Sequence, residues 1–268
     1  NLYNDTFLAG VKIEDFYLKT LDMNEYLYLS FAFGHFNLEN NTNIVTPIPT
    51  INCDKLNNTS GIELGIYNLS EFKCPDLSGL SNKSLYGDWN TPESTRIYIT
   101  LSLCNDDQTE CKNFEEINRK FDEQIIFLSV ISPIVEYSVL NYEKPFTVKM
   151  NEYYDILNPN QFILEEFHFS QYIIDDDKGA LFSEETQTKK LGVGSTKKLG
   201  DSRRKREKDN RIGSNIRDQN LFWGEISHPN SYQHYSRKYK KIFDIIGNVY
   251  ASCDTLNVIF IILLSSYS

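Results

Sequence analysis

The sequence lacks most of the motifs by which enzymes are recognised. It contains no G-x-S-x-G nucleophile motif, no P-loop and no G-x-G-x-x-G dinucleotide-binding motif. Its four histidines form no HExxH motif, and none of them lies near a cysteine. Because the five cysteines form no CxxC pair, a zinc site is poorly supported. We therefore predict no catalytic residue, no metal site and no cofactor.

Three acidic groups are the remaining candidates for chemistry. Glu165, Glu166 and His168 share an expected strand and could form an acid–base pair, but a half-exposed polar strand face explains them as well. The runs Asp106-Asp107 and Asp175-Asp176-Asp177 could contact Ca²⁺, yet neither has the spacing or the closing Glu of an EF-hand. We interpret both runs as solvated turns, and we keep a soluble hydrolase that uses Glu166 and His168 as the weakest alternative.

The start of the sequence is also missing familiar features. It begins at Asn1 rather than Met, and its first five residues do not form a signal peptide. We expect a fragment, a mature form or an incomplete gene model, which leaves room for a signal or a membrane segment before residue 1.

Charge is distributed unevenly along the chain. Residues 1–187 hold 12 Lys/Arg and 30 Asp/Glu, a net charge of −18, whereas residues 188–268 hold 15 and 7, a net charge of +8. An acidic body argues against nucleic acid as a partner, because phosphates repel it. With 268 residues, 40% of them hydrophobic, the chain can bury the core of one large domain or two small ones.

Cysteines and glycosylation sequons concentrate in the acidic body. Its four cysteines allow two disulfides in three connectivities, and the candidates are Cys53, Cys74, Cys104 and Cys111. The six residues between Cys104 and Cys111 suffice to turn the chain back, so a bridge between these two is sterically possible. N-x-[ST] sequons begin at Asn4, Asn40, Asn57, Asn58, Asn68 and Asn82. Together they favour an oxidising, lumenal or extracellular compartment.

The hydrophobic pattern indicates an α+β fold that is mostly antiparallel β with a few helices. Residues 96–103 alternate Ile and Leu with Tyr, Thr and Ser, which is typical of a half-buried antiparallel strand. A helix is expected to begin at Asn113, an N-cap candidate followed by two glutamates. Further strands are expected at residues 26–33, 144–150, 161–174 and 221–226.

Several breaks are expected between these elements. Pro133 should end the apolar segment 124–135, and residues 46–49 should form an extended connector because Pro47 and Pro49 lack the donor of a central strand. A bulge is expected at Glu165-Glu166, and residues 51–95 should be irregular and disulfide-stapled.

We divide the chain into four parts by composition. We expect residues 1–182 to form a β-rich, disulfide-containing domain and residues 183–220 a basic mobile loop. Residues 221–241 should form a final strand and a pre-membrane helix, and residues 242–268 a membrane segment, either whole or truncated. The loop contains Arg203-Arg204-Lys205-Arg206. In a secreted protein this run resembles a dibasic processing site, and in the cytosol it resembles a patch for anionic lipids or nuclear localisation. A solvated loop explains the run as well.

The C-terminal segment is long enough to cross a bilayer. Residues 242–264 comprise 23 positions, but Asp244 and Asp254 interrupt them, and each carboxylate costs roughly 2.5–3.5 kcal/mol at the bilayer centre. A buried C-terminal element of a soluble domain and a corrupted terminus are the alternatives. The four basic residues between 237 and 241 would place this flank in the cytoplasm, which conflicts with the sequons and cysteines.

Residues 235–248, YSRKYKKIFDIIGN, resemble the pre-membrane segment of a large family of uncharacterised ciliate transmembrane proteins. The residues that carry the resemblance are Arg237, Tyr239, Asp244 and Gly247. It implies an ectodomain in which a strand ends at Cys104 and a helix follows Cys111, and it implies no molecular function. The sequence departs from the family pattern at Asn248, where a second Gly is expected, and at Asp254.

We therefore expect a membrane-anchored ectodomain protein that acts by binding or surface display, with the main domain extracellular or lumenal. Its expected partners are the membrane and other protein subunits, and not nucleic acid. The alternative is a subunit of a two-span channel or receptor whose first span precedes residue 1.

Overall fold

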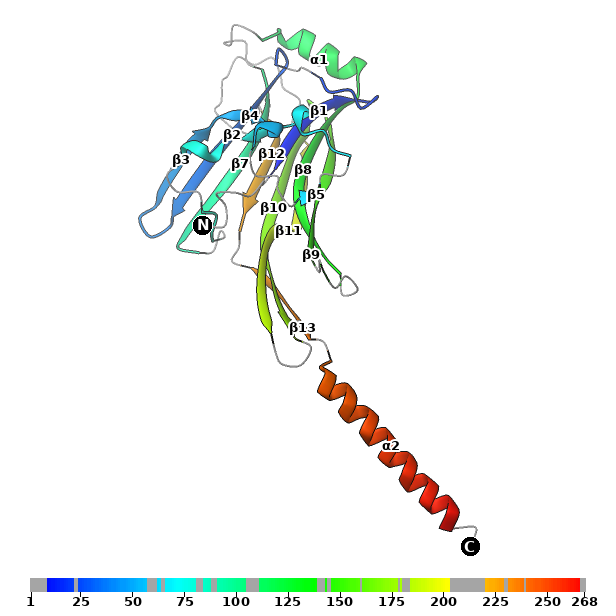
Figure 1. Cartoon of the computed structure of the whole chain (residues 1–268). Helices are drawn as coiled ribbons and strands as arrows, with labels where there is room; N and C mark the ends of the chain where they lie inside the picture. Colours follow the sequence, from blue (N-terminus) through cyan, green and yellow to red (C-terminus); the bar gives the residue numbers. More distant parts are fainter. Residues whose placement is uncertain are drawn as a thin grey trace. The chain divides into compact units, whose positions relative to one another are not determined.

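The computed structural model describes residues 9–21, 24–56, 62–63, 66–80, 84–87, 91–104, 111–138, 143, 146–159, 161–177, 179, 184–202, 220–228, 231–238 and 240–265. The chain divides into two compact units (Figure 1). The first unit comprises residues 1–171 and 190–232, and the second comprises residues 172–189 and 233–268.

Two mostly antiparallel sheets build the first unit, and two of their strands, β10 and β11, extend into the second unit. The order in the first sheet is β4 (Thr50–Asn52), β6 (Lys73–Pro75), β1 (Gly10–Asp15), β8 (Ile126–Tyr137), β9 (Phe146–Leu157) and β5 (Ile62–Glu63). The order in the second sheet is β11 (Glu185–Ser202), β10 (Gln161–Asp177), β12 (Asn220–Ser227), β7 (Glu93–Leu103), β2 (Leu27–Asn37) and β3 (Thr42–Ile48). Of these pairings, β10–β12 and β5–β9 are parallel.

The core lies between the two sheets. Ile97, Ile99 and Leu101 of β7 are at most 1% exposed and belong to the same buried cluster as Leu128 and Val130 of β8. These residues share the face that the sequence of β7 predicts, because successive strand residues point to opposite faces. The other face is not exposed, however, since Arg96 is fully buried and Tyr98 is 6% exposed, so the expectation of a half-buried strand is wrong here. The expected fold class, mostly β with a few helices, is confirmed.

Both disulfides support elements that border the core. Cys104 at the end of β7 is bonded to Cys111, and helix α1 (Phe114–Glu123) follows. Asn113 caps this helix, because its side-chain oxygen accepts a hydrogen bond from the Glu116 amide at 3.0 Å. The second disulfide joins Cys53, in the short 3-10 helix Cys53–Lys55, to Cys74 in β6. Two further 3-10 helices, Leu69–Glu71 and Leu77–Gly79, complete this part of the chain.

Two prolines do not interrupt the strands where we expected breaks, whereas Pro49 does lie between β3 and β4. Pro133 lies inside β8, which continues to Tyr137. The register pairs of β8 with β1 run only from Ile126 to Ile131, so Pro133 lies beyond them. Pro47 likewise belongs to β3 rather than to a connector, and β3 ends the order of the second sheet, where a missing donor is tolerated.

The expected mobile loop is instead the long strand β11 over residues 185–202. Leu191 and Val193 are buried in the core, whereas the residues on either side of this short segment are mostly exposed. The low apolar content therefore reflects a strand at the end of the sheet. Gly192 packs against β8, where an added Cβ would lie 2.9 Å from Val135 Cγ2 and 3.1 Å from the Pro133 carbonyl oxygen. The tetrabasic run 203–206 lies outside the described residues.

The expected bulge at Glu165-Glu166 is absent from the pairing of β10 with β12. The register from Ile163↔Phe222 to His168↔Ser227 advances without a shift. Glu165 is 4% exposed, so it takes the core-facing place that its position in the alternation assigns to it. The apparent break in the hydrophobic pattern is thus a buried carboxylate and not an extra residue.

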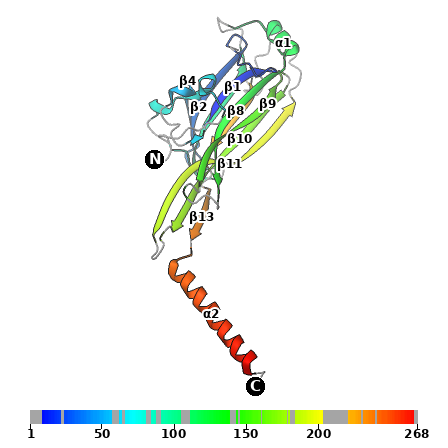
Figure 2. The same cartoon turned by 45° about the vertical axis from the view of Figure 1, so that its right-hand side comes forward.

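The second unit differs from its expected form in two ways. Residues 232–238 form strand β13, which pairs with β10, and not a pre-membrane helix (Figures 1 and 2). Asp175, Asp176 and Asp177 belong to β10 and not to a solvated turn, and the latter two are at most 4% exposed. Helix α2 then runs over Ile242–Ser265.

Candidate functional site

Helix α2 has the length and composition of a membrane span. The candidate span Ile242–Ile262 has 21 residues, and none of its described side chains is buried. The whole helix of 24 residues is about 36 Å long at 1.5 Å per residue, which exceeds a hydrocarbon core of about 30 Å. An apolar helix that stays exposed in water is unfavourable, so α2 could anchor the chain in a membrane.

Several polar side chains of α2 form hydrogen bonds within the helix or with the residue before it. The Asp244 carboxylate accepts a hydrogen bond from the Lys241 amide at 3.1 Å, which is the reciprocal half of a capping box. The hydroxyls of Ser252 and Thr255 each donate to the carbonyl four residues earlier, both at 2.8 Å. Asp254 has no hydrogen bond or ion pair among the described residues.

Ahead of α2, three consecutive aspartates of β10 each contact one basic residue. The pairs are Asp175 Oδ2–His234 Nε2 at 2.5 Å, Asp176 Oδ2–Arg237 Nη2 at 2.6 Å and Asp177 Oδ1–Lys241 Nζ at 2.6 Å. We call these six residues the charged clamp. Because neighbouring strand residues point to opposite faces, Asp176 lies on the other face of β10 from Asp175 and Asp177. The clamp therefore ties both faces of β10 to the segment that leads into α2.

The central pair of the clamp is the most buried one. The Arg237 and Asp176 side chains are 5% and 4% exposed, and two parallel hydrogen bonds of 2.9 Å and 2.6 Å join them. Bidentate geometry of this kind makes an Arg–carboxylate pair stronger than a single contact. A buried charge pair is costly to break, because the remaining partner stays buried and uncompensated.

The outer aspartates are held in their ionised form. The hydrogen bond from Lys241, helped by the Glu184 amide, lowers the pKa of Asp177 to about 2. Hydrogen bonds from Gln187 and His234 lower the pKa of Asp175. Lys241 also donates to the Gly179 carbonyl at 2.6 Å. Asp175 and Asp177 are thus ionised at neutral pH.

The residues that carried the sequence resemblance have separate roles here. Arg237 belongs to the clamp, and Asp244 caps α2. Gly247 lies on the exposed surface of α2, where an added Cβ would meet nothing within 4 Å. Tyr239 lies outside the described residues. Sequence reasoning noted the acidic triplet 175–177 but missed its pairing with basic residues. The available signal was the segment 234–241, which holds one His and four Lys/Arg.

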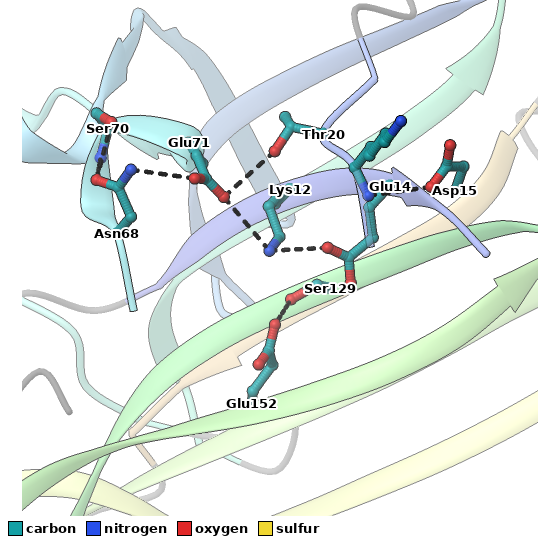
Figure 3. Close-up of polar contacts among 10 residues, drawn as sticks. Lys12, Glu14, Asp15, Thr20, Asn68, Ser70, Glu71, Ser129 and Glu152 are labelled. Atoms are coloured by element: carbon teal, nitrogen blue, oxygen red, sulfur yellow. Dashed lines mark hydrogen bonds and ion pairs between the residues drawn. The ribbon is translucent and has the colours of Figure 1, made fainter. Parts of the chain in front are cut away.

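A second polar cluster lies on the face of the first sheet that carries the Cys53–Cys74 segment (Figure 3). Lys12 Nζ lies 2.8 Å from Glu14 Oε2 and 3.7 Å from Glu71 Oε2, and Glu71 also accepts a hydrogen bond from Asn68 at 3.0 Å. Glu14 is fully buried. Beside it, Ser129 donates a short hydrogen bond to Glu152. The Lys12–Glu71 contact fastens the 3-10 helix Leu69–Glu71 to β1, and the Ser129–Glu152 bond joins β8 to β9, so both have a structural role.

The hydrolase candidates Glu166 and His168 do lie together on the second sheet. His168 Nε2 is 3.4 Å from Glu166 Oε2, and its Nδ1 is 3.0 Å from Ser227 Oγ on β12. The three groups occur in the order of a Ser–His–acid arrangement. Ser227, however, is 4% exposed at the end of β12, where it is paired with His168 of β10, so its hydroxyl is withheld from a substrate.

Two of the six sequon asparagines are described. Asn40 lies in an exposed turn after β2. Asn68 caps a 3-10 helix, and its side chain is engaged with both Ser70 and Glu71. Asn4, Asn57, Asn58 and Asn82 lie outside the described residues, as do Asp106 and Asp107.

Comparison with known proteins places the chain in a family. No curated protein matches it. Residues 10–217, which are most of the chain and reach from β1 past β11, match the family described as the uncharacterised 80 kDa protein N-terminal domain. The chain belongs to this family.

Proposed function

We propose that the chain is a membrane-anchored ectodomain protein, in which the β-rich unit acts by binding or surface display. The observation that carries the proposal is α2, an exposed apolar helix of sufficient length to span a bilayer. The likeness of residues 235–248 to the pre-membrane segment of ciliate transmembrane proteins supports the same assignment. The clamp suits this role, because it joins the start of α2 to a strand by charged contacts.

The two disulfides support placement of the ectodomain on the oxidising side of the membrane. The basic residues before α2 argued for the opposite orientation, but the net positive charge of this flank is smaller in the folded chain than in the sequence. Arg237 and Lys241 are paired with Asp176 and Asp177, so two of its four positive charges are neutralised locally in the folded chain. Lys238 and Lys240 remain as positive charges that favour a cytoplasmic position for this flank.

The test is carbonate extraction of membranes from cells that express the full chain, combined with glycosidase treatment and thiol labelling. We expect the chain to remain in the membrane pellet, to shift in mass on deglycosylation and to show one free thiol, Cys253. A matched variant with Val258→Asp and Ile261→Asp should become extractable. Extraction of the unmodified chain would refute the anchor, and five reactive thiols would refute the oxidising compartment.

Among the described sequons, Asn40 should carry more glycan than Asn68. Asn40 is exposed in a turn, whereas the Asn68 amide donates to Glu71 at 3.0 Å. Peptide mapping with Asn40→Gln and Asn68→Gln checks this expectation. Modification of Asn68 alone would contradict it.

A subunit of a channel or receptor is the second candidate. It is favoured by Asp254, a carboxylate near the middle of the candidate span, because ionisable residues at this depth commonly mark contacts between membrane helices or an aqueous path. That the chain is not an enzyme remains a prediction, and the burial of Ser227 supports it.

A further inference from the structure

Helix α2 carries its least explained polar residue at mid-span. Asp254 is twelve residues beyond Ile242, which places it about 18 Å along the helix at 1.5 Å per residue. This is near the centre of a hydrocarbon core of about 30 Å. A carboxylate at this depth is costly unless it faces protein or water, and Asp254 has no partner among the described residues of its own chain.

The residues around Asp254 form one stripe of the helix. Gly247, Tyr250, Asp254, Asn257 and Ile261 follow one another at alternating three- and four-residue spacing, which places them on a single face. Gly247 leaves open space at its Cβ position, so a neighbouring helix can approach closely there. Ser252 lies on the opposite face, where its hydroxyl is already bonded to the Asn248 carbonyl.

We propose that this stripe of α2 docks a transmembrane helix of another protein, and that the partner helix supplies an Arg or Lys opposite Asp254. The proposal rests on the membrane anchor proposed above. Charge complementarity selects the occupant, because a basic side chain would neutralise the carboxylate within the bilayer. A second copy of this chain cannot do so, since residues 242–265 contain no Lys or Arg and would bring aspartate against aspartate.

The test uses the full chain in phosphatidylcholine vesicles with affinity-tagged probe helices. The probes are leucine-rich helices of 21 residues that carry Arg, Leu or Asp at the central position. We expect the Arg probe to retain about tenfold more of the chain than the Leu probe on affinity capture, and the Asp probe to retain no more than the Leu probe. Asp254→Leu should abolish the preference for Arg, whereas Ser252→Ala should keep it.

A charge swap separates pairing from nonspecific association. Asp254→Lys should lose the preference for the Arg probe and gain one for the Asp probe. Equal retention of all three probes by the unmodified chain would overturn the proposal. So would efficient formation of a disulfide-linked dimer through Cys253 in the absence of probe, because it would point to a second copy.

The same vesicles distinguish the two levels of the argument. If carbonate extracts the full chain, the membrane anchor fails, and the docking proposal fails with it. If the chain resists extraction but ignores the charge of the probe, the anchor stands and only the docking proposal is refuted. Asp254→Leu should resist extraction as well, since it removes a charge from the span.

Discussion

Replacement of Arg237 by Met isolates the contribution of the buried pair to the second unit. Methionine retains most of the aliphatic bulk but removes both hydrogen bonds to Asp176 and leaves its carboxylate, which is 4% exposed, without its guanidinium partner. Loss of one member of a buried ion pair destabilises by about 3–5 kcal/mol. The cost should appear in this unit first, because both residues belong to it.

Hydrogen exchange of the full chain in detergent micelles measures this cost locally. Backbone amides of β13 and of residues 172–177 should exchange about 100-fold faster or more in Arg237→Met, since each 1.4 kcal/mol is a factor of ten. Amides of β7, in the first unit, should be unchanged. Lys238→Met is the matched control, because Lys238 is the exposed neighbour of Arg237 on β13.

The double variant Asp176→Leu, Arg237→Met decides the mechanism. Replacement of both members of a buried ion pair by apolar groups often changes stability little. The amide exchange rates of the double variant should therefore return to within about tenfold of those of the unmodified chain. If Arg237→Met exchanges like Lys238→Met, the pair does not stabilise the unit. If the double variant is as unprotected as the single one, the uncompensated carboxylate is not the cause of the loss.

The first unit and the outer clamp offer four further tests. Burial raises the pKa of Glu165 to about 7, so the folded chain binds a proton more tightly than the unfolded one, and stability should fall as pH rises from about 4.5 to 7. Glu165→Gln should remove this fall and raise the free energy of unfolding above pH 7 by up to about 3 kcal/mol in urea titrations; an unchanged pH profile would refute the assignment. The depressed pKa of Asp177 acts in the opposite sense, because the stabilisation by its ionised form is present above about pH 4 and is lost as pH falls to about 2. Hydrogen exchange of the β10 amides should show this loss in the unmodified chain and not in the reference variant Asp177→Asn. Gly10→Ala should cost about 1–3 kcal/mol by thermal unfolding, because the added Cβ would lie 2.8 Å from the sulfur of Cys53, whereas Gly79→Ala, with nothing within 4 Å, should be nearly neutral. Replacement of the Cys53–Cys74 pair by serines should cost about 3 kcal/mol by loop-closure entropy, and a value near zero would show that the loop is held by its packing alone.

Local signals in the sequence were sufficient for several elements. The alternation in residues 96–103 predicts β7, and Asn113 followed by two glutamates predicts the start of α1. The Cys104–Cys111 bridge was sterically possible from seven residues of separation. The extent of α2 follows from an apolar composition that no tertiary contact alters. In each case the determining interactions lie within a few positions of one another.

Contacts between distant residues decided the rest. The sequence permitted three disulfide connectivities, and only the pairing of β4 with β6 brings Cys53 to Cys74. Residues 185–202 are too polar to be recognised as a strand, yet they form one because β10 and β8 lie beside Leu191 and Gly192. Pairing of β13 with β10 brings Asp176 and Arg237 together across 61 residues. An acidic triplet and a basic segment each look solvated alone, and burial of their charges becomes favourable only when the fold supplies the opposite one.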